Sequence, residues 1–255
     1  MTTVLLVRHG LTALTGKVLL GWTPGVGLDE RGRAQAKGVA ARLAKVPLAA
    51  VVSSPLDRCA QTAAQIAATR PDGGAVDVVT DDRIGECHYG DWTGQELATL
   101  VKDPLWKVVQ AHPSAVTFPG PAGEALRDTQ ARSVAAVRDW NARLGPDATW
   151  LLCSHGDVIR TILADALGLH LDLYHRLNVD PCSLTVIRYS QLRPFVLRVN
   201  ELGGAVDDLL PRPQQEDKAA GTPAGDEPGD PGAGGDPGQS GDSVVGGGAG
   251  VFTES

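Results

Sequence analysis

VLLVRHG (residues 4–10) is an apolar run that ends in an Arg-His-Gly step, and WLLCSHG (residues 150–156) repeats this form late in the chain. Continuous apolar runs are typical of strands that are buried on both faces of a parallel sheet. Ligands bind outside the carboxyl ends of such strands. We therefore expect His9 and His155 to lie close together at one edge of a single sheet.

Strands and helices alternate through residues 1–202. Apolar runs predict strands at residues 3–7, 49–52, 76–79 and 149–153, and a closing pair at residues 184–189 and 194–199. Periodicity and terminal signals predict helices at residues 29–45, 54–69, 124–144 and 157–167. This alternation predicts an α/β fold with a mainly parallel sheet.

Two helix starts and one irregular segment carry specific signals. Asp29 is expected to open the first helix, and Ser54, followed by Pro55, is expected to cap the second. Residues 96–123 are interrupted by four prolines, so we expect short helices there that cover a site.

The last fifth of the chain has a different composition. Residues 203–255 contain 14 glycines, six prolines and ten acidic residues, and they carry a net charge of −8 against +1 for residues 1–202. Such a stretch has too little apolar surface to offset the entropy of ordering its backbone. We expect one folded catalytic domain at residues 1–202 and an acidic, disordered tail at residues 203–255.

Several classes of partner and site are excluded. No cluster of basic residues interleaved with aromatic ones points to nucleic acid, and no apolar stretch is long enough to span a membrane. The four cysteines are widely spaced and suggest neither a disulfide framework nor a zinc site. We expect a cytoplasmic protein without a metal or other cofactor, and a homodimer is left open.

Four residues point to a phosphoryl group. Arg8 stands beside His9 at a strand end, where its charge would need a buried partner such as an anion. Arg58 falls in the first turn after the second strand, and His155 begins a helix after another. Guanidinium groups bind phosphate oxygens in pairs, and a helix N-terminus favours an anion. The four side chains therefore predict a pocket for a doubly charged phosphoryl group.

A carboxyl group is also available in IGECHYGDWTG (residues 84–94). Glu86 is the candidate proton donor to a leaving-group oxygen, and Asp91 competes with it for that role. His88 and Tyr89 are expected to line a substrate pocket together with Trp22 and Thr23, although ordinary packing would also explain them.

These motifs together resemble the histidine phosphatase superfamily, in its phosphoglycerate-mutase-like branch. The resemblance rests on RHG at 8–10, GW at 21–22, SSPLDRCAQTA at 53–63, ECHYGDWTG at 86–94 and SHGDVIR at 154–160. It implies a three-layer α/β/α sandwich and a metal-independent enzyme. It also implies that His9 is the nucleophile, that Glu86 is the general acid, and that Arg8, Arg58 and His155 hold the phosphoryl group.

The chain departs from the family pattern at informative places. Thr15 stands nearest to the position of an asparagine that contacts the phosphate in relatives, and we expect its hydroxyl group to act there instead. Cys87 replaces the arginine that follows the acid in cofactor-dependent mutases, and residues 102–123 lack the basic pair of those enzymes. We therefore expect a phosphomonoester hydrolase acting on a small phosphorylated metabolite. A phosphoglycerate-type mutase and a non-enzymatic phospholigand-binding protein are the alternatives.

Overall fold

Six strands form one sheet in the computed structural model, which describes residues 1–69 and 76–204. Their order is β3-β2-β4-β1-β5-β6, and β5 runs antiparallel to both of its neighbours while the other pairs are parallel. The strands are β1 (Thr2–Arg8), β2 (Val51–Ser53), β3 (Val78–Thr80), β4 (Thr149–Ser154), β5 (Leu184–Tyr189) and β6 (Pro194–Glu201). The predicted mainly parallel sheet is confirmed. The expectation of a disordered tail falls outside the described residues from 205 onward.

The register of the sheet brings three strand ends to the same level. Arg8, the last residue of β1, pairs with Ser154, the last residue of β4. Ser53, the last residue of β2, pairs with Cys153. Because parallel strands share one carboxyl edge, the turns that follow β1, β2 and β4 all open onto that edge.

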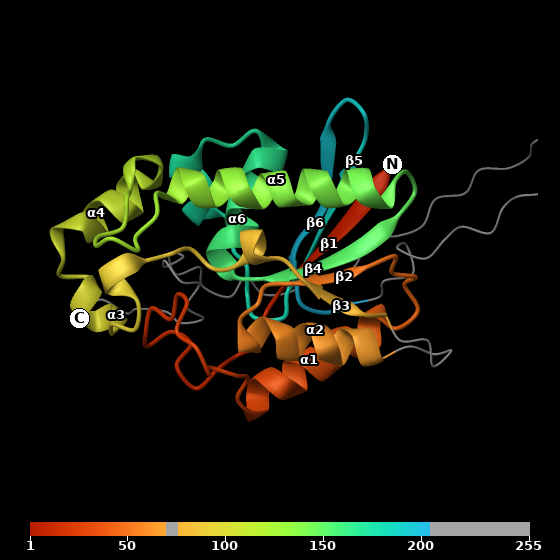
Figure 1. Ribbon diagram of the computed structural model, residues 1–255, viewed down its shortest axis with the longest axis horizontal. Helices are drawn as coiled ribbons and strands as arrows, with labels where there is room; N and C mark the ends of the chain where they lie inside the picture. The colour runs from red at the N-terminus through yellow and green to blue at the C-terminus, as the bar shows by residue number, and fades with distance from the viewer. Residues whose placement is uncertain (70–75, 205–255) are drawn as a thin grey trace, which may run out of the picture.

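Helices cover both faces of the sheet (Figure 1). Helices α1 (Glu30–Leu43) and α2 (Asp57–Ala68) lie on one face, and α5 (Leu126–Leu144) and α6 (Gly156–Leu167) lie on the other. Side chains of β1 alternate between the layers, because Leu5 and Val7 pack in the core with α1 and α2 while Val4 and Leu6 pack in the core with α5 and α6. This arrangement confirms the expected three-layer α/β/α sandwich.

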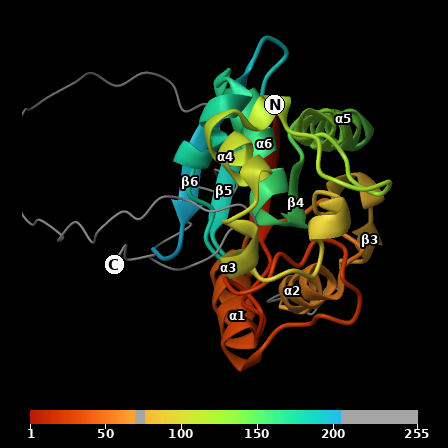
Figure 2. The ribbon, with the colours of Figure 1, turned by 90° about the vertical axis from the view of Figure 1, so that its left-hand side faces the viewer.

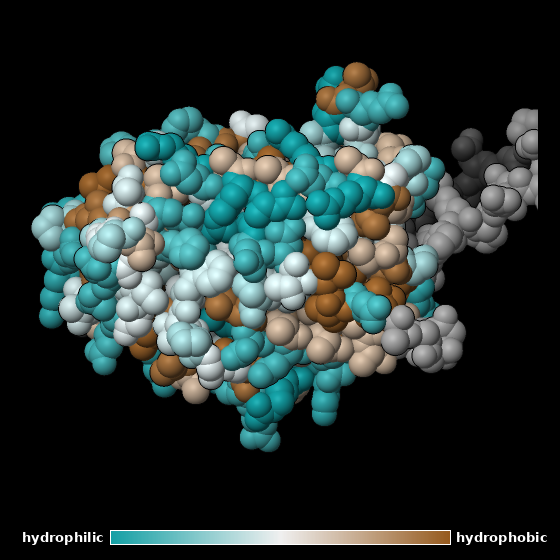
Figure 3. All heavy atoms as spheres, in the orientation of Figure 1, coloured by the Kyte–Doolittle hydropathy of each residue, from teal (hydrophilic) through white to brown (hydrophobic). Residues whose placement is uncertain are grey.

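Helix α5 is amphipathic in the way its position requires. Ala136 and Val137 are buried in the core with β1 and β4, whereas Arg138 and Asp139 are exposed. The outward face of this helix forms a hydrophilic band on the surface (Figure 3).

A subdomain that we call the cap lies between β3 and α5 (Figure 2). It contains η1 (Asp82–Ile84), η2 (Gly90–Trp92), α3 (Leu97–Leu100), α4 (Pro104–Ala111) and η3 (Pro113–Ala115). Trp92, Trp106 and Phe118 form its own apolar core, together with Leu171 and Tyr174 of η4 (Leu171–Arg176). Short helices between prolines were expected here, and the structure has them.

The start of α2 differs from the prediction. Asp29 does cap α1, accepting a hydrogen bond from the backbone N–H of Gly32 at 2.7 Å. Helix α2, however, begins at Asp57, so the prediction that Ser54 caps it was wrong. The physical reason is that the backbone N–H of Ser54 still donates to Cys153 of β4, which holds Ser54 in the extended segment.

Candidate active site

Five charged or titratable side chains meet at the carboxyl edge of the sheet. Arg8 and His9 follow from β1, Arg58 lies in the first turn of α2, Glu86 lies in the cap, and His155 precedes α6. All five are at least 95% buried. Buried charges are expensive unless they are paired, so this concentration of charge marks a site where an ion binds.

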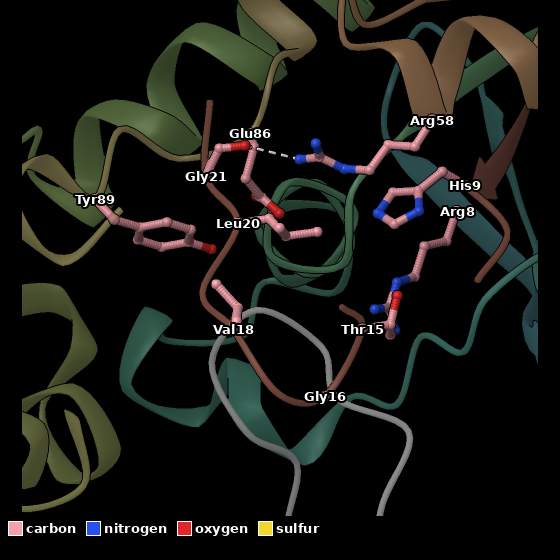
Figure 4. Close-up of a pocket in the computed structure, with 10 residues that line it drawn as sticks. All are labelled: Arg8, His9, Thr15, Gly16, Val18, Leu20, Gly21, Arg58, Glu86 and Tyr89. Atoms are coloured by element: carbon pink, nitrogen blue, oxygen red, sulfur yellow. Dashed lines mark hydrogen bonds between the residues drawn. The ribbon is translucent and has the colours of Figure 1, made fainter. Parts of the chain in front are cut away.

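A cavity opens among Arg8, His9, Arg58 and Glu86 (Figure 4), and His155 lies outside its described wall. Its described wall consists of Arg8, His9, Thr15, Gly16, Val18, Leu20, Gly21, Arg58, Glu86 and Tyr89. The segment from Thr15 to Gly21, in the loop after β1, supplies half of the lining residues. The cavity wall therefore combines the end of β1, the loop that follows it, the start of α2 and the cap.

The ring of His9 is held in one tautomer. Its Nδ1 lies 2.8 Å from the carbonyl oxygen of Gly10, and because a carbonyl oxygen can only accept, Nδ1 carries the proton. Burial, followed by the charges of Arg58 and Arg8, holds the pKa of His9 well below its usual range. The ring is therefore neutral, and Nε2 keeps its lone pair for attack on an electrophile.

Arg58 uses only one of its three guanidinium nitrogens in hydrogen bonds to the described chain. Its Nη2 donates to the carbonyl oxygen of Gly21 at 2.8 Å and to Nδ1 of His155 at 3.2 Å. Within the described chain, its Nε and Nη1 are buried and have no hydrogen-bond partner. Nearly all buried donors in proteins are satisfied, so these two indicate an anionic ligand.

Arg8 contributes the second guanidinium group. Its Nη1 donates to the carbonyl oxygen of Val179 at 2.7 Å, which anchors the side chain beside His9. Burial, and then the charge of Arg160, lowers the pKa of Arg8 to about 10, so it remains a cation at neutral pH.

His155 lies against His9, with ring centroids 5.2 Å apart in an edge arrangement. Its Nδ1 accepts from Arg58, and its Nε2 lies 2.8 Å from Oγ of Ser54. Burial and the charge of Arg58 lower its pKa well below the usual range. With Nδ1 accepting, the neutral ring carries its proton on Nε2 and donates to Ser54.

Ser54 is thus a site residue that sequence reasoning assigned to a helix cap. The motif SSP looks the same in both roles. Only contact with His155, from a different strand end, distinguishes them.

The carboxyl group of Glu86 is adjusted for proton transfer near neutral pH. Burial raises its pKa to about 7, with a further contribution from Asp157, while Arg58 opposes the shift. Oε1 accepts from the backbone N–H of Cys87 at 3.0 Å, and Oε2 lies 3.8 Å from Nδ1 of His155. Its competitor Asp91 is exposed and is not part of the cavity wall.

An arginine of α5, missed by sequence reasoning, holds the loop of Glu86. Nη1 of Arg132 donates to the carbonyl oxygens of Arg83 and Gly85 at 2.7 and 2.8 Å, and Nη2 donates to that of Glu86 at 2.9 Å. Arg132 also pairs with Glu124 at 2.6 Å. A helix arginine normally reads as a solvated surface charge, so the sequence offered no signal for this role.

The four expected substrate-pocket residues take different places. Tyr89 lines the cavity and donates its hydroxyl proton to Oδ2 of Asp157 at 2.6 Å. Trp22 stacks on His88 with ring centroids 4.5 Å apart, and its Nε1 donates to the carbonyl oxygen of Glu86. Thr23 donates to Leu20 within a turn. Trp22, His88 and Thr23 lie outside the cavity wall.

Thr15 lies on the cavity wall, as its expected role requires. Its hydroxyl oxygen accepts from the backbone N–H of Thr12 at 2.9 Å and lies 3.0 Å from the hydroxyl oxygen of the same residue. The hydroxyl group is therefore oriented by the turn that carries it.

Neither a metal site nor a membrane-spanning helix is found among the described residues. Within residues 1–69 and 76–204, no group of three or more His, Cys, Asp or Glu side chains is arranged to hold a metal ion. In the same part of the chain, every helix is too short or too polar to cross a bilayer.

Comparisons with known proteins give consistent matches. A family described as the histidine phosphatase superfamily (branch 1) matches residues 4–202. The chain is 34% identical to the bifunctional protein Rv2228c of Mycobacterium tuberculosis over 205 residues, which cover 79% of this chain and 54% of that protein. It therefore spans about half the length of that relative.

Two other matches extend over most of both chains. A 2,3-bisphosphoglycerate-dependent phosphoglycerate mutase 2 of Gloeobacter violaceus is 30% identical over 189 residues, covering 71% of this chain and 83% of the relative. The solved structure of the mycobacterial glucosyl-3-phosphoglycerate phosphatase Rv2419c with VO3 superposes with a TM-score of 0.67 at 27% identity, covering 78% of this chain and 98% of that one.

Proposed function

The chain belongs to the histidine phosphatase superfamily (branch 1), and from this membership we propose that it is a phosphomonoester hydrolase acting through a phosphohistidine at His9. One observation carries the proposal: a neutral histidine with a free Nε2 lies between two buried guanidinium groups. The substrate is a small phosphorylated metabolite. The names of one relative and one structural neighbour both contain a phosphorylated metabolite.

In the first step, Nε2 of His9 attacks phosphorus and a P–N bond forms. The bond from phosphorus to the ester oxygen breaks, its electron pair stays on that oxygen, and Glu86 supplies the proton that makes it an alcohol. Arg8 and Arg58 surround the charge of the transferred group, and His155 orients Arg58 by accepting from its Nη2. Phosphoryl transfer is mostly a matter of position and charge stabilisation, which these groups supply.

In the second step, Glu86 acts as a base. It takes a proton from water while the water oxygen attacks phosphorus, and the electron pair of the P–N bond returns to Nε2 of His9. Inorganic phosphate leaves, and Glu86 is protonated for the next cycle. A pKa near 7 suits a group that must give and take a proton at neutral pH.

We propose that no metal ion takes part. Two guanidinium groups bring two positive charges to a phosphoryl group that carries about two negative ones. Turnover that is insensitive to a chelator is the expected result, and loss of turnover on chelation, restored by a divalent metal, would contradict it.

Hydrolysis is favoured over a mutase reaction by the residue after the acid. Cys87 is fully buried in the cap core and lies outside the cavity wall, so this position offers no cation to a substrate carboxylate. A mutase must hold its intermediate for re-transfer, which requires such contacts. Water is then the acceptor.

A cytoplasmic location is also part of the proposal. It is supported by four buried cysteines at positions 59, 87, 153 and 182, all of which are free thiols. Free thiols are typical of reducing compartments.

The test is phosphate release from an aryl phosphate by the full chain. His9→Ala is expected to abolish turnover, whereas His170→Ala, which changes an exposed histidine, is expected to leave it intact. A stalled reaction should carry a phosphoryl label that is lost in acid and kept in base, as expected of phosphohistidine. Near wild-type turnover in His9→Ala would refute the mechanism, and ligand binding without any turnover would favour the binding-protein alternative.

A further inference from the structure

The cavity contains two cations and one carboxyl group. Arg8, Arg58 and Glu86 are the charged members of its described wall, and the other lining residues are neutral. The phosphoryl group itself needs both cations, because it carries about two negative charges at neutral pH. No lining cation of the described chain is then left for a second anionic group on the substrate.

Two other arginines near the site, the half-buried Arg132 and the buried Arg160, are already engaged. Arg132 pairs with Glu124 at 2.6 Å and binds three backbone carbonyl oxygens. Arg160 pairs with Asp157 at 3.2 Å and donates to the carbonyl oxygen of Leu177 at 2.8 Å. A substrate carboxylate would therefore be buried without a cation and close to Glu86, which costs free energy.

The wall opposite His9 suits a different kind of leaving group. The hydroxyl group of Tyr89 points into the cavity (Figure 4) and has already given its single proton to Asp157. Its oxygen can therefore only accept a further hydrogen bond. An alcohol hydroxyl group can donate to this oxygen, whereas a carboxylate cannot. Val18 and Leu20 complete this side with apolar surface.

We infer that the cavity selects phosphomonoesters of uncharged, hydroxyl-bearing alcohols, such as polyol or sugar phosphates, over esters that also carry a carboxylate. This inference rests on the hydrolase function proposed above. It narrows the substrate from phosphorylated metabolites in general to one chemical class.

Matched substrate pairs test the inference on the full chain. In the first pair, glycerol 3-phosphate has a hydroxymethyl group where 3-phosphoglycerate has a carboxylate. In the second pair, sorbitol 6-phosphate and 6-phosphogluconate differ in the same way. We expect kcat/KM to favour the uncharged member by at least about tenfold in each pair. Equal or higher kcat/KM for the carboxylates would overturn the inference, and so would failure to hydrolyse either uncharged ester while an aryl phosphate is turned over.

The aryl phosphate distinguishes failure of the proposed hydrolase function from failure of the inferred substrate class. If it is not hydrolysed, the proposed function fails. If it is hydrolysed by the wild type and not by His9→Ala, the function stands, and the pairs decide the substrate class alone.

Adding a positive charge to the cavity wall gives a second, independent test of substrate selectivity. Val18→Lys places an ammonium group on the wall, and the ratio of kcat/KM for 3-phosphoglycerate over glycerol 3-phosphate is expected to rise at least about threefold. Val18→Met, of similar length and without charge, is expected to keep that ratio within about twofold of the wild type. An unchanged ratio in a folded Val18→Lys protein would count against the inference.

Lys17 provides the remaining control. It lies between two lining residues, but its side chain is exposed and is not part of the cavity wall. Lys17→Met is expected to leave the ratio unchanged. A selective loss of 3-phosphoglycerate turnover in this variant would assign Lys17 to a carboxylate and overturn the inference.

Discussion

A guanidinium nitrogen of Arg132 donates to the backbone carbonyl oxygen of Glu86 at 2.9 Å, so helix α5 holds the loop that carries the proposed proton donor. The carboxyl group of Glu86 owes its raised pKa first to burial. By fixing the backbone of Glu86, Arg132 therefore also keeps its carboxyl group buried and its pKa raised. This contact spans 46 residues of sequence and joins the cap to the helical layer.

Replacing Arg132 with lysine should slow the chemical step. An ammonium group cannot reach three carbonyl oxygens and pair with Glu124 at the same time. We expect Arg132→Lys to lower kcat by about 10- to 100-fold with a smaller change in KM, and to lower the apparent pKa of the acid group as its loop becomes more solvated. The measurements are steady-state kinetics and a pH profile. Arg138→Lys, on the exposed face of the same helix, is the control. Equal effects in both variants would argue for a purely structural role.

The pH dependence of kcat/KM should report Glu86. Its pKa is raised to about 7, and the first step needs the protonated form, which is lost as the pH rises. For an alkyl phosphate, kcat/KM should therefore fall about tenfold per pH unit above pH 7, and the fall should disappear in Glu86→Gln. His9 adds no limb near neutrality, because its pKa lies well below the usual range. A flat profile for the wild type up to pH 9 would exclude this assignment.

The competing carboxyl group can be tested by the same assay. Asp91 is exposed and lies outside the cavity wall, so Asp91→Asn should keep kcat/KM for an alkyl phosphate within about twofold of the wild type. A loss comparable to that of Glu86→Gln would make Asp91 the acid.

The carboxyl group of Glu86 should also destabilise the fold at high pH. Its pKa is higher in the folded than in the unfolded protein, so the ionised form opposes folding. This penalty is absent below the unfolded pKa of about 4.3 and complete above about pH 7. Glu86→Gln should therefore raise the free energy of unfolding by about 1–3 kcal/mol at pH 8 and leave it nearly unchanged at pH 4.5. Denaturant unfolding at both pH values measures this, and a gain that does not grow with pH would contradict it.

Ser54 should matter through the ring of His155. Ser54→Ala removes the partner of Nε2 and is expected to lower kcat/KM about tenfold and the free energy of unfolding by about 1–2 kcal/mol. Ser53→Ala removes a buried hydroxyl group that donates to the next carbonyl oxygen and does not touch the ring. This control should lose stability without a similar loss of kcat/KM. If both variants keep full activity, Ser54 does not orient His155.

Much of the architecture was readable from local patterns. The apolar runs before His9 and His155 predicted two buried strands of one parallel sheet, because burial on both faces leaves no polar alternation. The alternation of strands and helices predicted the parallel sheet, and parallel strands necessarily share a carboxyl edge. These inferences succeed because strand and helix periods are properties of consecutive residues.

The sequence could not distinguish groups whose roles depend on distant neighbours. Glu86 and Asp91 lie five residues apart in the same loop, yet only Glu86 is buried in the cavity. Ser54 resembled a helix cap, and Arg132 resembled a surface charge. Each takes its role from a partner 46 or more residues away. The sequence by itself determined which types of residue form this site. Their protonation states, orientations and separate roles depend on burial and on hydrogen-bond partners, which exist only in the packed tertiary structure.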